Sequence, residues 1–209
     1  MRSYGQYCGL AKALDVIGDR WTILIVRELL IGEGRYTDLL KGLPGIATNL
    51  LATRLEEMRQ AGLVSREELP PPAAATVFRL TPRGQDLRPV IQALGKWAEP
   101  LMTGRAKGEH VRTRWMALPA EFYLDDRMPT DRSIAIQIDG ADESIVIESR
   151  EGRVRARAGR AADPDVTLTG SPELALGIMM GRMTAAAAKK RGLTIDGDVR
   201  VLKRLRRSD

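Results

Sequence analysis

The sequence predicts an α+β protein with two domains, and three observations lead to that prediction. Through the first half, apolar side chains recur at helical spacings of three and four, interrupted by one pair of alternating segments. A short polar segment then separates this half from one in which alternating segments dominate. The end of the chain returns to helical spacing, and strands followed by helices are typical of an α+β domain.

Composition excludes several kinds of chemistry. The 209 residues include one cysteine, Cys8, and one histidine, His110. A disulfide within one chain is therefore impossible, and a zinc site of Cys and His has too few ligands. Any nucleophile paired with a histidine would have to use His110. Loose acid pairs such as Asp163 and Asp165 are typical of solvated turns. We therefore expect no enzymatic activity, no metal and no cofactor.

The charge distribution does not locate a partner. The formal net charge is +6, yet residues 1–104 hold 13 basic and 11 acidic residues, and residues 189–209 alone hold eight basic against three acidic. A nucleic-acid interface must therefore be found from local pattern. The sequence shows neither a signal-type apolar segment nor an apolar run long enough to span a bilayer, so we expect a cytoplasmic protein with no membrane partner.

The first two predicted helices differ in their apolar pattern. One face of the first helix holds Tyr7, Leu10, Leu14 and Ile17, and Gly18 follows as a C-cap. Asp19 suits the N-cap of the next helix. That helix, "RWTILIVRELLI", is apolar nearly all round and is expected to be buried.

The next two helices form a helix-turn-helix pattern. A short helix in "RYTDLLKGLPG" ends at Pro44-Gly45, and the stretch "GIATNLLATRLEEMRQAGLVSRE" follows. Its buried stripe holds Leu51, Leu55, Met58 and Gly62. Its opposite side holds Asn49, Thr53, Glu56 and Gln60. The middle of this second helix is therefore acidic rather than basic.

The remaining segments complete two domains. "LVSREEL" and "TVFRLT" predict a hairpin with "PPPAAA" at its tip, and Thr81 with Pro82 begins a further helix over Leu87, Ile91, Leu94 and Ala98. We place the domains at residues 1–102 and 110–209, with a linker over 103–109. In the second, "WMALPAEFYL" is expected to be helical, and "SIAIQID", "SIVIES", "RVRARA" and "DVTLTG" predict an antiparallel sheet. "ELALGIMMGRM", "AAAAKKRG" and "DVRVLKRL" predict helices, with Ser171 capping the first of them.

Several blocks of the first domain match one family in order. Cys8, "DRWTILIVREL", "GEGRYTDLLKGLPGI", "LLATRLEEMRQAGLVSREE" and "FRLTPRGQDL" resemble the HxlR family of bacterial transcription regulators. These are winged helix-turn-helix proteins of the MarR-like type. The resemblance covers roughly residues 5–102. It implies binding to double-stranded DNA and a homodimer built through the terminal helices.

The resemblance places a reading helix at about Ala47 to Ala61. Its N-terminal side chains Thr48, Asn49 and Thr53 are the candidates for base contacts, and an Asn suits bidentate pairing with adenine. Arg54, Arg35 and Arg79 are the candidates for phosphate contacts. Two alternatives stay open: Arg54 is an ion-pair partner of Glu56, Glu57 or Asp38, and Thr48 is only a helix cap.

Three further features of this domain bear on function. The family usually has a serine where this chain has Ala47, which predicts that Thr48 takes over the cap. The wing tip lacks Lys and Arg, so a salt slope steeper than about −8 for the dimer would contradict our short list of phosphate contacts. Cys8 stands where some members of the family place a sensing thiol. Its alternative role is that of a small half-buried packing residue, and we favour the latter.

The second domain resembles another family. "ADPDVTLTGSPELALGIMMGRM" and "LTIDGDVRVLKRL" are similar to the sterol carrier protein type 2 fold, over about residues 110–209. The resemblance implies a domain that binds an apolar small molecule, which in a regulator would act as an effector. The candidate ligand-binding residues are Trp115, Phe122, Leu176, Met179, Met180 and Met183. Ordinary core packing is the alternative for this Met-rich stripe.

Together these features predict a DNA-binding transcriptional regulator, a repressor, whose second domain binds an apolar effector. The alternative is a carrier of lipids or other apolar ligands whose helical domain serves protein association. The weak charge bias of residues 1–104 motivates that alternative. Sequence-selective binding to promoter DNA distinguishes the two.

Overall fold

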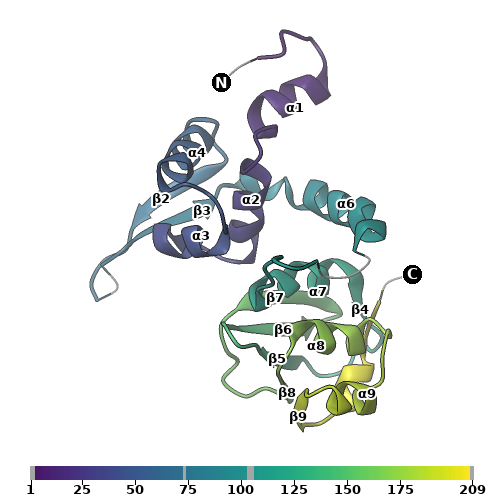
Figure 1. Cartoon of the computed structure of the whole chain (residues 1–209). Coiled ribbons are helices and arrows are strands. Elements are labelled where there is room, and N and C mark those ends of the chain that lie inside the picture. The colour runs from purple at the N-terminus through teal and green to yellow at the C-terminus, as the bar shows by residue number, and fades with distance from the viewer. Residues whose placement is uncertain (1–2, 73, 103–105, 208–209) are drawn as a thin grey trace. The chain divides into compact units, whose positions relative to one another are not determined.

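The structure is a computed structural model that describes residues 3–72, 74–102 and 106–207. The chain divides into two compact units, Met1–His110 and Val111–Asp209. Figure 1 shows the first as mainly helical and the second as built on a sheet. The predicted linker over 103–109 falls partly outside the described residues. Within the described ranges, no helix combines the length and the apolar character needed to cross a membrane.

The first unit combines helices with a small antiparallel sheet. Its helices are α1 (Gly9–Ile17), α2 (Thr22–Ile31), α3 (Tyr36–Gly42), α4 (Thr48–Gln60), α5 (Pro82–Gln85), α6 (Arg88–Ala98) and the 3₁₀ turn η1 (Glu99–Leu101). Its strands are β1 (Gly34–Arg35), β2 (Val64–Glu68) and β3 (Thr76–Leu80), in the order β1-β3-β2. The predicted helix-turn-helix and hairpin are confirmed, and β1 is a strand that the sequence did not predict.

The core of this unit lies around α2 and α4. Ile25 and Val26 of α2 are fully buried, as is Leu51 of α4, and Leu55 and Met58 extend the same stripe. Removal of such a side chain from water contributes about 1.5–3 kcal/mol. The spacing of 51, 55 and 58 therefore fixes which side of α4 faces solvent.

Several local predictions for this unit are wrong in detail. Tyr7 precedes α1, and Asp19 does not cap α2, because α2 begins at Thr22 and the Thr22 N–H donates to the Asp19 carbonyl at 3.1 Å. The helix expected from Thr81 onward is split into α5 and α6. Pro89 has no N–H to donate to the preceding turn, so a regular helix cannot continue through it.

The second unit is a five-stranded sheet with helices. The sheet has the order β7-β6-β5-β8-β9, from strands β5 (Ile134–Asp139), β6 (Ser144–Arg150), β7 (Arg153–Ala158), β8 (Val166–Thr169) and β9 (Thr194–Gly197). Its helical elements are η2 (Thr113–Met116), α7 (Ala117–Tyr123), α8 (Pro172–Met179), α9 (Ala185–Lys190) and η3 (Val201–Lys203). A separate pair joins β4 (Leu124–Asp126) to β10 (Leu205–Arg207).

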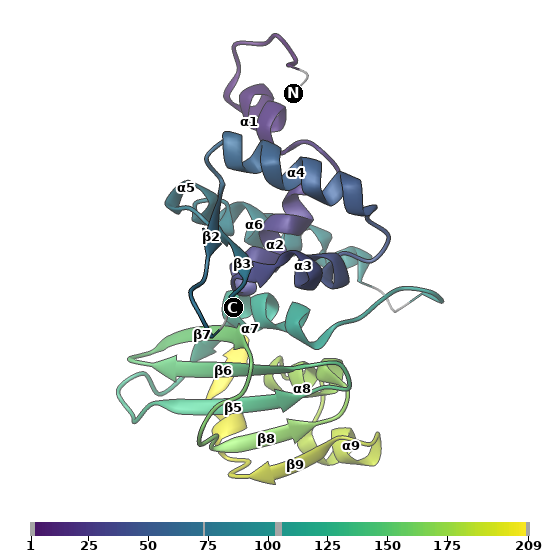
Figure 2. The same ribbon diagram turned by 90° about the vertical axis from the view of Figure 1, so that its left-hand side faces the viewer.

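The expectation of an antiparallel sheet is wrong, because the sheet is mixed. β5 pairs with β8 in parallel, with Ile136 opposite Val166 and Ile138 opposite Leu168. β5–β6, β6–β7 and β8–β9 are antiparallel. The connection from β7 to β8 crosses over the sheet rather than turning back, as Figure 2 shows. Alternation predicts each strand but not the direction of its partner.

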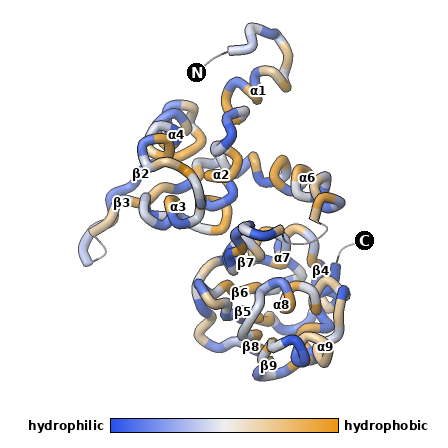
Figure 3. The backbone as a smooth tube through the Cα atoms, in the orientation of Figure 1, coloured by the Kyte–Doolittle hydropathy of each residue, from blue (hydrophilic) through white to orange (hydrophobic). Residues whose placement is uncertain are grey.

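The two faces of this sheet differ in character. Ile134, Ile136 and Ile138 of β5 are buried on one face with Ile145 and Ile147 of β6, and α7 and α8 pack against these strands. The hydrophobic colouring of Figure 3 runs along these strands. Residues one place along each strand point to the other face.

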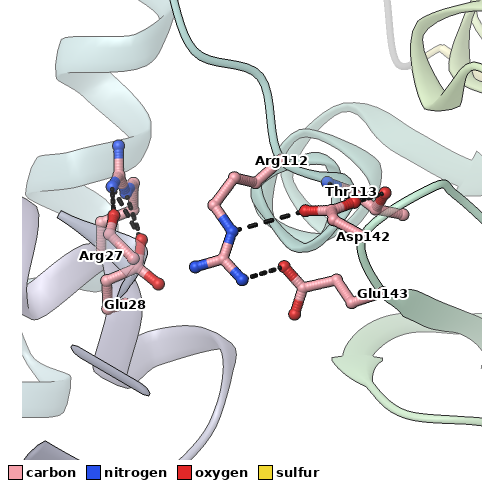
Figure 4. Close-up of polar contacts among 7 residues, drawn as sticks. Arg27, Glu28, Arg112, Thr113, Asp142 and Glu143 are labelled. Carbon is pink, nitrogen blue, oxygen red and sulfur yellow. Dashed lines mark hydrogen bonds and ion pairs between the residues drawn. The ribbon is translucent and has the colours of Figure 1, made fainter. Parts of the chain in front are cut away.

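Polar side chains secure the ends of the second unit. The helix expected over "DVRVLKRL" is wrong in extent, because only the turn η3 forms there. The Arg204 guanidinium then turns inward and binds the Asp126 carboxylate at 2.8 and 2.7 Å. After this ion pair the chain continues as β10, which pairs with β4. At the other end, Arg112 binds Asp142 at 3.4 Å and Glu143 at 2.9 Å (Figure 4). These pairs tie the first residues of the unit to the β5–β6 turn.

Candidate nucleic-acid interface

The second helix of the helix-turn-helix, α4, presents its first turns to solvent. Its N-cap is Ala47, whose side chain has no oxygen to cap the helix, and Thr48 is the first helical residue. The prediction that Thr48 takes over the cap is therefore wrong. The Tyr36 hydroxyl donates a hydrogen bond to the Thr48 carbonyl, which ties the beginning of α3 to the beginning of α4. The exposed end of α4 is thus held in place from the preceding helix.

The three predicted base-reading residues lie together on this exposed side. Thr48, Asn49 and Thr53 are all exposed, opposite the buried Leu51 and Leu55. The Asn49 Oδ1 accepts from the Leu50 N–H at 2.9 Å, and the Thr53 hydroxyl donates to the Asn49 carbonyl at 3.0 Å. Among the described residues the Asn49 amide group makes no donated hydrogen bond, so its N–H donors are available to a base edge.

The predicted phosphate-binding arginines differ in their partners. Arg54 forms ion pairs with Asp19 and Glu57. Glu57 was among the alternatives foreseen for Arg54. Asp19 was not, because nothing in the spacing connects positions 19 and 54. Arg79 binds Glu33 at 2.5 Å and Glu67 at 3.1 Å. Arg35 is exposed and has no ion pair within the described part of the chain.

The acidic middle of α4 is held by its own helix. The Glu56 carboxylate accepts from Arg59 at 2.8 and 2.7 Å and from Gln60 at 2.9 Å, and the hydrogen bonds from Arg59 and then Gln60 lower the pKa of Glu56 to about 2. The group is therefore charged at neutral pH. It lies one turn beyond the cluster that begins at Thr48.

The wing is poor in available cations. On β2, Arg66 binds Glu68 at 2.8 Å, and Glu67 holds Arg79 across the hairpin. The described tip residues Pro70–Pro72 and Ala74 are exposed and uncharged. The structure thus gives the wing little positive charge for phosphates, which agrees with the composition of its tip.

Cys8 occupies the N-cap position of α1 and is exposed. The favoured role of a half-buried packing residue is therefore wrong within one chain. The backbone N–H of Ala11 and, less strongly, that of Leu10 lower the pKa of the Cys8 thiol, because they stabilise the thiolate at the start of a helix. This is an electrostatic setting that the sequence pattern did not reveal.

A cavity of about 720 Å³ lies between the N-terminal segment and α4. Tyr4 and Leu14 line it on one side, and Asp19, Arg54 and Glu57 line it on the other. The ion pairs of Arg54 are thus part of its wall. The cavity adjoins the flank of α4 rather than its base-reading end.

Two terminal helices of the first unit carry uncovered apolar side chains. The exposed ones on and beside α1 are Tyr4, Tyr7, Leu10 and Leu14, and those on and after α6 are Val90, Leu94, Trp97, Leu101 and Met102. Trp97 is 76% exposed. Apolar patches of this kind are typical of protein interfaces. α6 and α1 are the terminal helices from which the resemblance predicted dimer contacts.

The predicted ligand-binding residues of the second unit fall into two groups. Leu176 and Met179 lie in α8, and Met180 is its C-cap. The Met183 side chain packs against Gly177 of α8, with the Met183 Cε 3.3 Å from the position that a Cβ on Gly177 would occupy. Trp115 lies in η2, which packs on α8. Phe122 lies on α7, over β6 and β7, and is therefore not in the α8 group. Met179 is fully buried, and the others are half-buried.

No group of three or more His, Cys, Asp or Glu side chains in the described ranges is arranged to hold a metal ion. Several charged side chains of the first unit are instead paired with one another, as Arg54 is with Asp19 and Glu57. The chemistry available at the exposed end of α4 is hydrogen bonding from neutral side chains, with Arg35 as a nearby cation that has no ion pair among the described residues.

Comparisons with known proteins separate the same two parts. The model of the HxlR-like helix-turn-helix matches residues 16–105, and that of the SCP-2 sterol transfer family matches residues 123–207. An uncharacterised HTH-type transcriptional regulator of Synechocystis sp. is 34% identical over 92 residues, which cover 44% of this chain and 68% of that protein. YvaP of Bacillus subtilis, another uncharacterised HTH-type transcriptional regulator, is 34% identical over 87 residues, which cover 42% of this chain and 81% of YvaP. The HTH-type transcriptional regulator YodB of the same organism is 32% identical over 43% and 80%, respectively.

Proposed function

Because the chain belongs to the HxlR family of helix-turn-helix transcriptional regulators and carries an SCP-2 domain, we propose that it is a homodimeric repressor that reads its operator with the first turns of α4. The relatives named above are transcriptional regulators, not enzymes. The observation that supports the proposal is the exposed cluster of Thr48, Asn49 and Thr53, with the donors of Asn49 left available. In a cell, this protein would act in the cytoplasm, on promoter DNA.

Selection of bound fragments from a random duplex library identifies the operator, and substitution then tests how it is read. Asn49→Ala should weaken binding to the selected duplex by about 5- to 150-fold, which corresponds to the roughly 1–3 kcal/mol of one bidentate base contact. Gln60→Ala, at the exposed far end of the same helix, is the matched control and should change little. Equal affinities of the two variants, or no selective binding near physiological salt, would contradict the proposal.

Repression is a separate part of the proposal and needs its own readout. A reporter fused to the promoter that carries the selected operator should be silenced by the wild type and released by Asn49→Ala. An increase of transcription with the wild type would show an activator instead. Selective DNA binding would remain intact in that case.

The dimer is supported by the uncovered apolar side chains of α1 and α6. Trp97→Asp places a charge in the centre of the α6 patch and should yield a monomer in sedimentation. Lys96→Ala, its exposed neighbour on the same helix, is the control and should remain a dimer. If the Trp97→Asp protein is still a dimer, the dimer interface does not lie on α6.

The second domain supplies the proposed effector site. The matching family is the SCP-2 sterol transfer family. The half-buried Met180 and Met183 follow α8, against which η2 with Trp115 packs, and methionines are adaptable apolar groups. A dansyl-labelled fatty acid should therefore bind and accept energy from Trp115 in a protein with Trp21 and Trp97 replaced by Phe. Because coupling between two ligands is reciprocal, operator DNA should change the affinity for the probe by the same factor as the probe changes that for DNA. Probe binding without any selective DNA binding would favour a carrier.

A further inference from the structure

The β6–β7 hairpin carries a row of arginines on the face of the sheet opposite the isoleucines. In β7, Arg153, Arg155 and Arg157 are exposed, while Val154 is buried. The register places Ala156 opposite Ile147, so Arg155 and Arg157 point away from the apolar layer. Arg150 of β6 pairs with Arg153 and shares their face. We call Arg150, Arg153, Arg155 and Arg157 the arginine face.

Two carboxylates lie beneath the guanidinium groups of the arginine face: Glu148 on β6, and Glu121 on α7, which Arg155 binds at 2.8 Å. The side chain of Arg155 is 66% exposed, and that of Glu121 is 7% exposed. The side chains of Arg150 and Arg157 are 74% and 49% exposed, whereas that of Glu148, which they share, is 25% exposed. The contacts to Glu148 are 4.0 Å from Arg150 and 3.3 Å from Arg157. Arg153 has no ion pair within the described residues. The groups that meet an approaching partner are therefore mainly positive.

A row with this spacing suits a polyanion with regular charges. Alternate residues of a strand are about 6.6 Å apart, so the three arginines of β7 recur at a regular interval. A guanidinium also binds phosphate oxygens in a bidentate manner, which a lysine cannot do. The arginine face thus presents three phosphate-binding groups along β7, with Arg150 of β6 beside Arg153.

The first unit offers few free cations among its described candidate phosphate contacts, so a second surface could add to the affinity for DNA. Of its candidate phosphate contacts, Arg54 and Arg79 are each held by two carboxylates, and Arg35 alone has no ion pair among the described residues. Affinity for DNA depends strongly on neutralised phosphates. A regulator whose reading helix carries an acidic middle needs cations from elsewhere.

We infer that the arginine face of the SCP-2 domain is a second DNA-contacting surface, which binds the phosphate backbone flanking the operator. This inference rests on the proposed function of the first domain. It adds DNA binding to a domain whose family is named for sterol transfer. The contact carries no base specificity, because it involves phosphates only.

The test uses the full chain with Arg153→Gln and Arg157→Gln combined, and two duplexes that differ in length. One duplex covers only the selected operator, and the other adds flanking sequence on both sides. On the longer duplex, the double variant should lower the magnitude of the salt slope by about 1.8 per chain, at roughly 0.9 per phosphate. Between 50 and 200 mM salt this corresponds to a loss of affinity that is about tenfold smaller per chain, or about 150-fold smaller for the dimer. The short duplex should bind both proteins equally.

The control variant removes the same charge from another surface. Lys189→Gln combined with Arg191→Gln takes two exposed cations from the end of α9, outside the sheet. It should behave as the wild type on both duplexes. If the arginine and control variants lose slope equally, only net charge matters and the inference is wrong.

Two other outcomes separate the possible failures. If the wild type does not bind the short duplex selectively, the proposed function of the first domain fails. If the short duplex binds selectively but flanks add nothing, only the arginine face is refuted. Binding to vesicles that contain phosphatidylserine is measured in parallel. If the double arginine variant loses vesicle binding but keeps the DNA binding of the wild type, the arginine face contacts a lipid surface and the inference is overturned.

Discussion

The buried pair Asp126–Arg204 makes a measurable prediction about the stability of the second domain. The side chain of Asp126 is fully buried, and that of Arg204 is 7% exposed. Besides the two contacts from Arg204, the Asp126 carboxylate accepts from the Ser149 hydroxyl and from the Met128 N–H at 2.8 Å. Burial alone would raise the pKa of Asp126, but these hydrogen bonds and the Arg204 charge outweigh it and lower the pKa from 3.8 to about 2.

The sign and size of the pH effect follow from this shift. Because the folded pKa lies below the unfolded one, the unfolded state takes up the proton first as the pH falls. The stabilisation is therefore complete above about pH 5 and is lost between roughly pH 4 and pH 2. A lowering of the pKa from 3.8 to about 2 corresponds to about 2 kcal/mol of stabilisation.

Substitution tests the same pair at neutral pH. Asp126→Asn leaves Arg204 buried without its counter-charge, which costs about 3 kcal/mol, the lower end for a broken buried pair because the amide can still accept one hydrogen bond. With an m-value of about 1.5 kcal/mol/M, the urea midpoint should fall by about 2 M. Asp125→Asn, the exposed neighbour in β4, should shift it by less than about 0.5 M.

The assay must report the second domain alone. In a protein with Trp21 and Trp97 replaced by Phe, the fluorescence of Trp115 in η2 follows its unfolding. Midpoints are measured from pH 7 to pH 2.5 for the parent, Asp126→Asn and Asp125→Asn. The difference between the parent and Asp126→Asn should shrink as the pH approaches 2.5. Equal midpoints for the two variants at pH 7 would refute the assignment of Asp126 as a stabilising charge.

Three further predictions concern the first domain. Arg35→Gln should lower the magnitude of the operator salt slope by about 0.9 per chain. Arg79→Gln should lower the slope less, because two carboxylates already hold the Arg79 side chain. Fluorescence anisotropy across a salt series measures both slopes, and a larger effect of Arg79→Gln would contradict the ion-pair argument. Glu56→Gln should tighten binding to random duplexes, since its charge repels phosphate, and an unchanged affinity would count against this. If the lowered pKa of Cys8 makes it a sensor, oxidant should weaken operator binding of the wild type and not of Cys8→Ser; identical titrations would exclude that role.

Local periodicity was sufficient to predict most elements of this protein. The apolar stripe of Leu51, Leu55 and Met58 predicts both the presence of α4 and its buried side, because side chains three and four apart share one face of a helix. Thr81 before Pro82 predicts a helix start, and the Thr81 hydroxyl does accept the Gly84 N–H at 3.1 Å. Such signals are contained within a few neighbouring residues.

The candidate reading residues were predictable for the same reason, but their electrostatic partners were not. Positions 48, 49 and 53 follow from the buried stripe by geometry. The ion pair of Arg54 with Asp19 joins residues 35 positions apart and depends on how α4 packs beside the α1–α2 turn. No periodic pattern encodes that distance.

Tertiary structure alone decided the features that depend on which segments become neighbours. Alternation along "SIAIQID" and "DVTLTG" determines two strands and their apolar faces, because it is a property of each backbone segment. Their parallel pairing depends instead on the crossover of the chain between β7 and β8. In the same way, "RVRARA" shows alternating arginines in the sequence, whereas their common exposed face arises only from the register with β6 and the carboxylate of Glu148 beneath them.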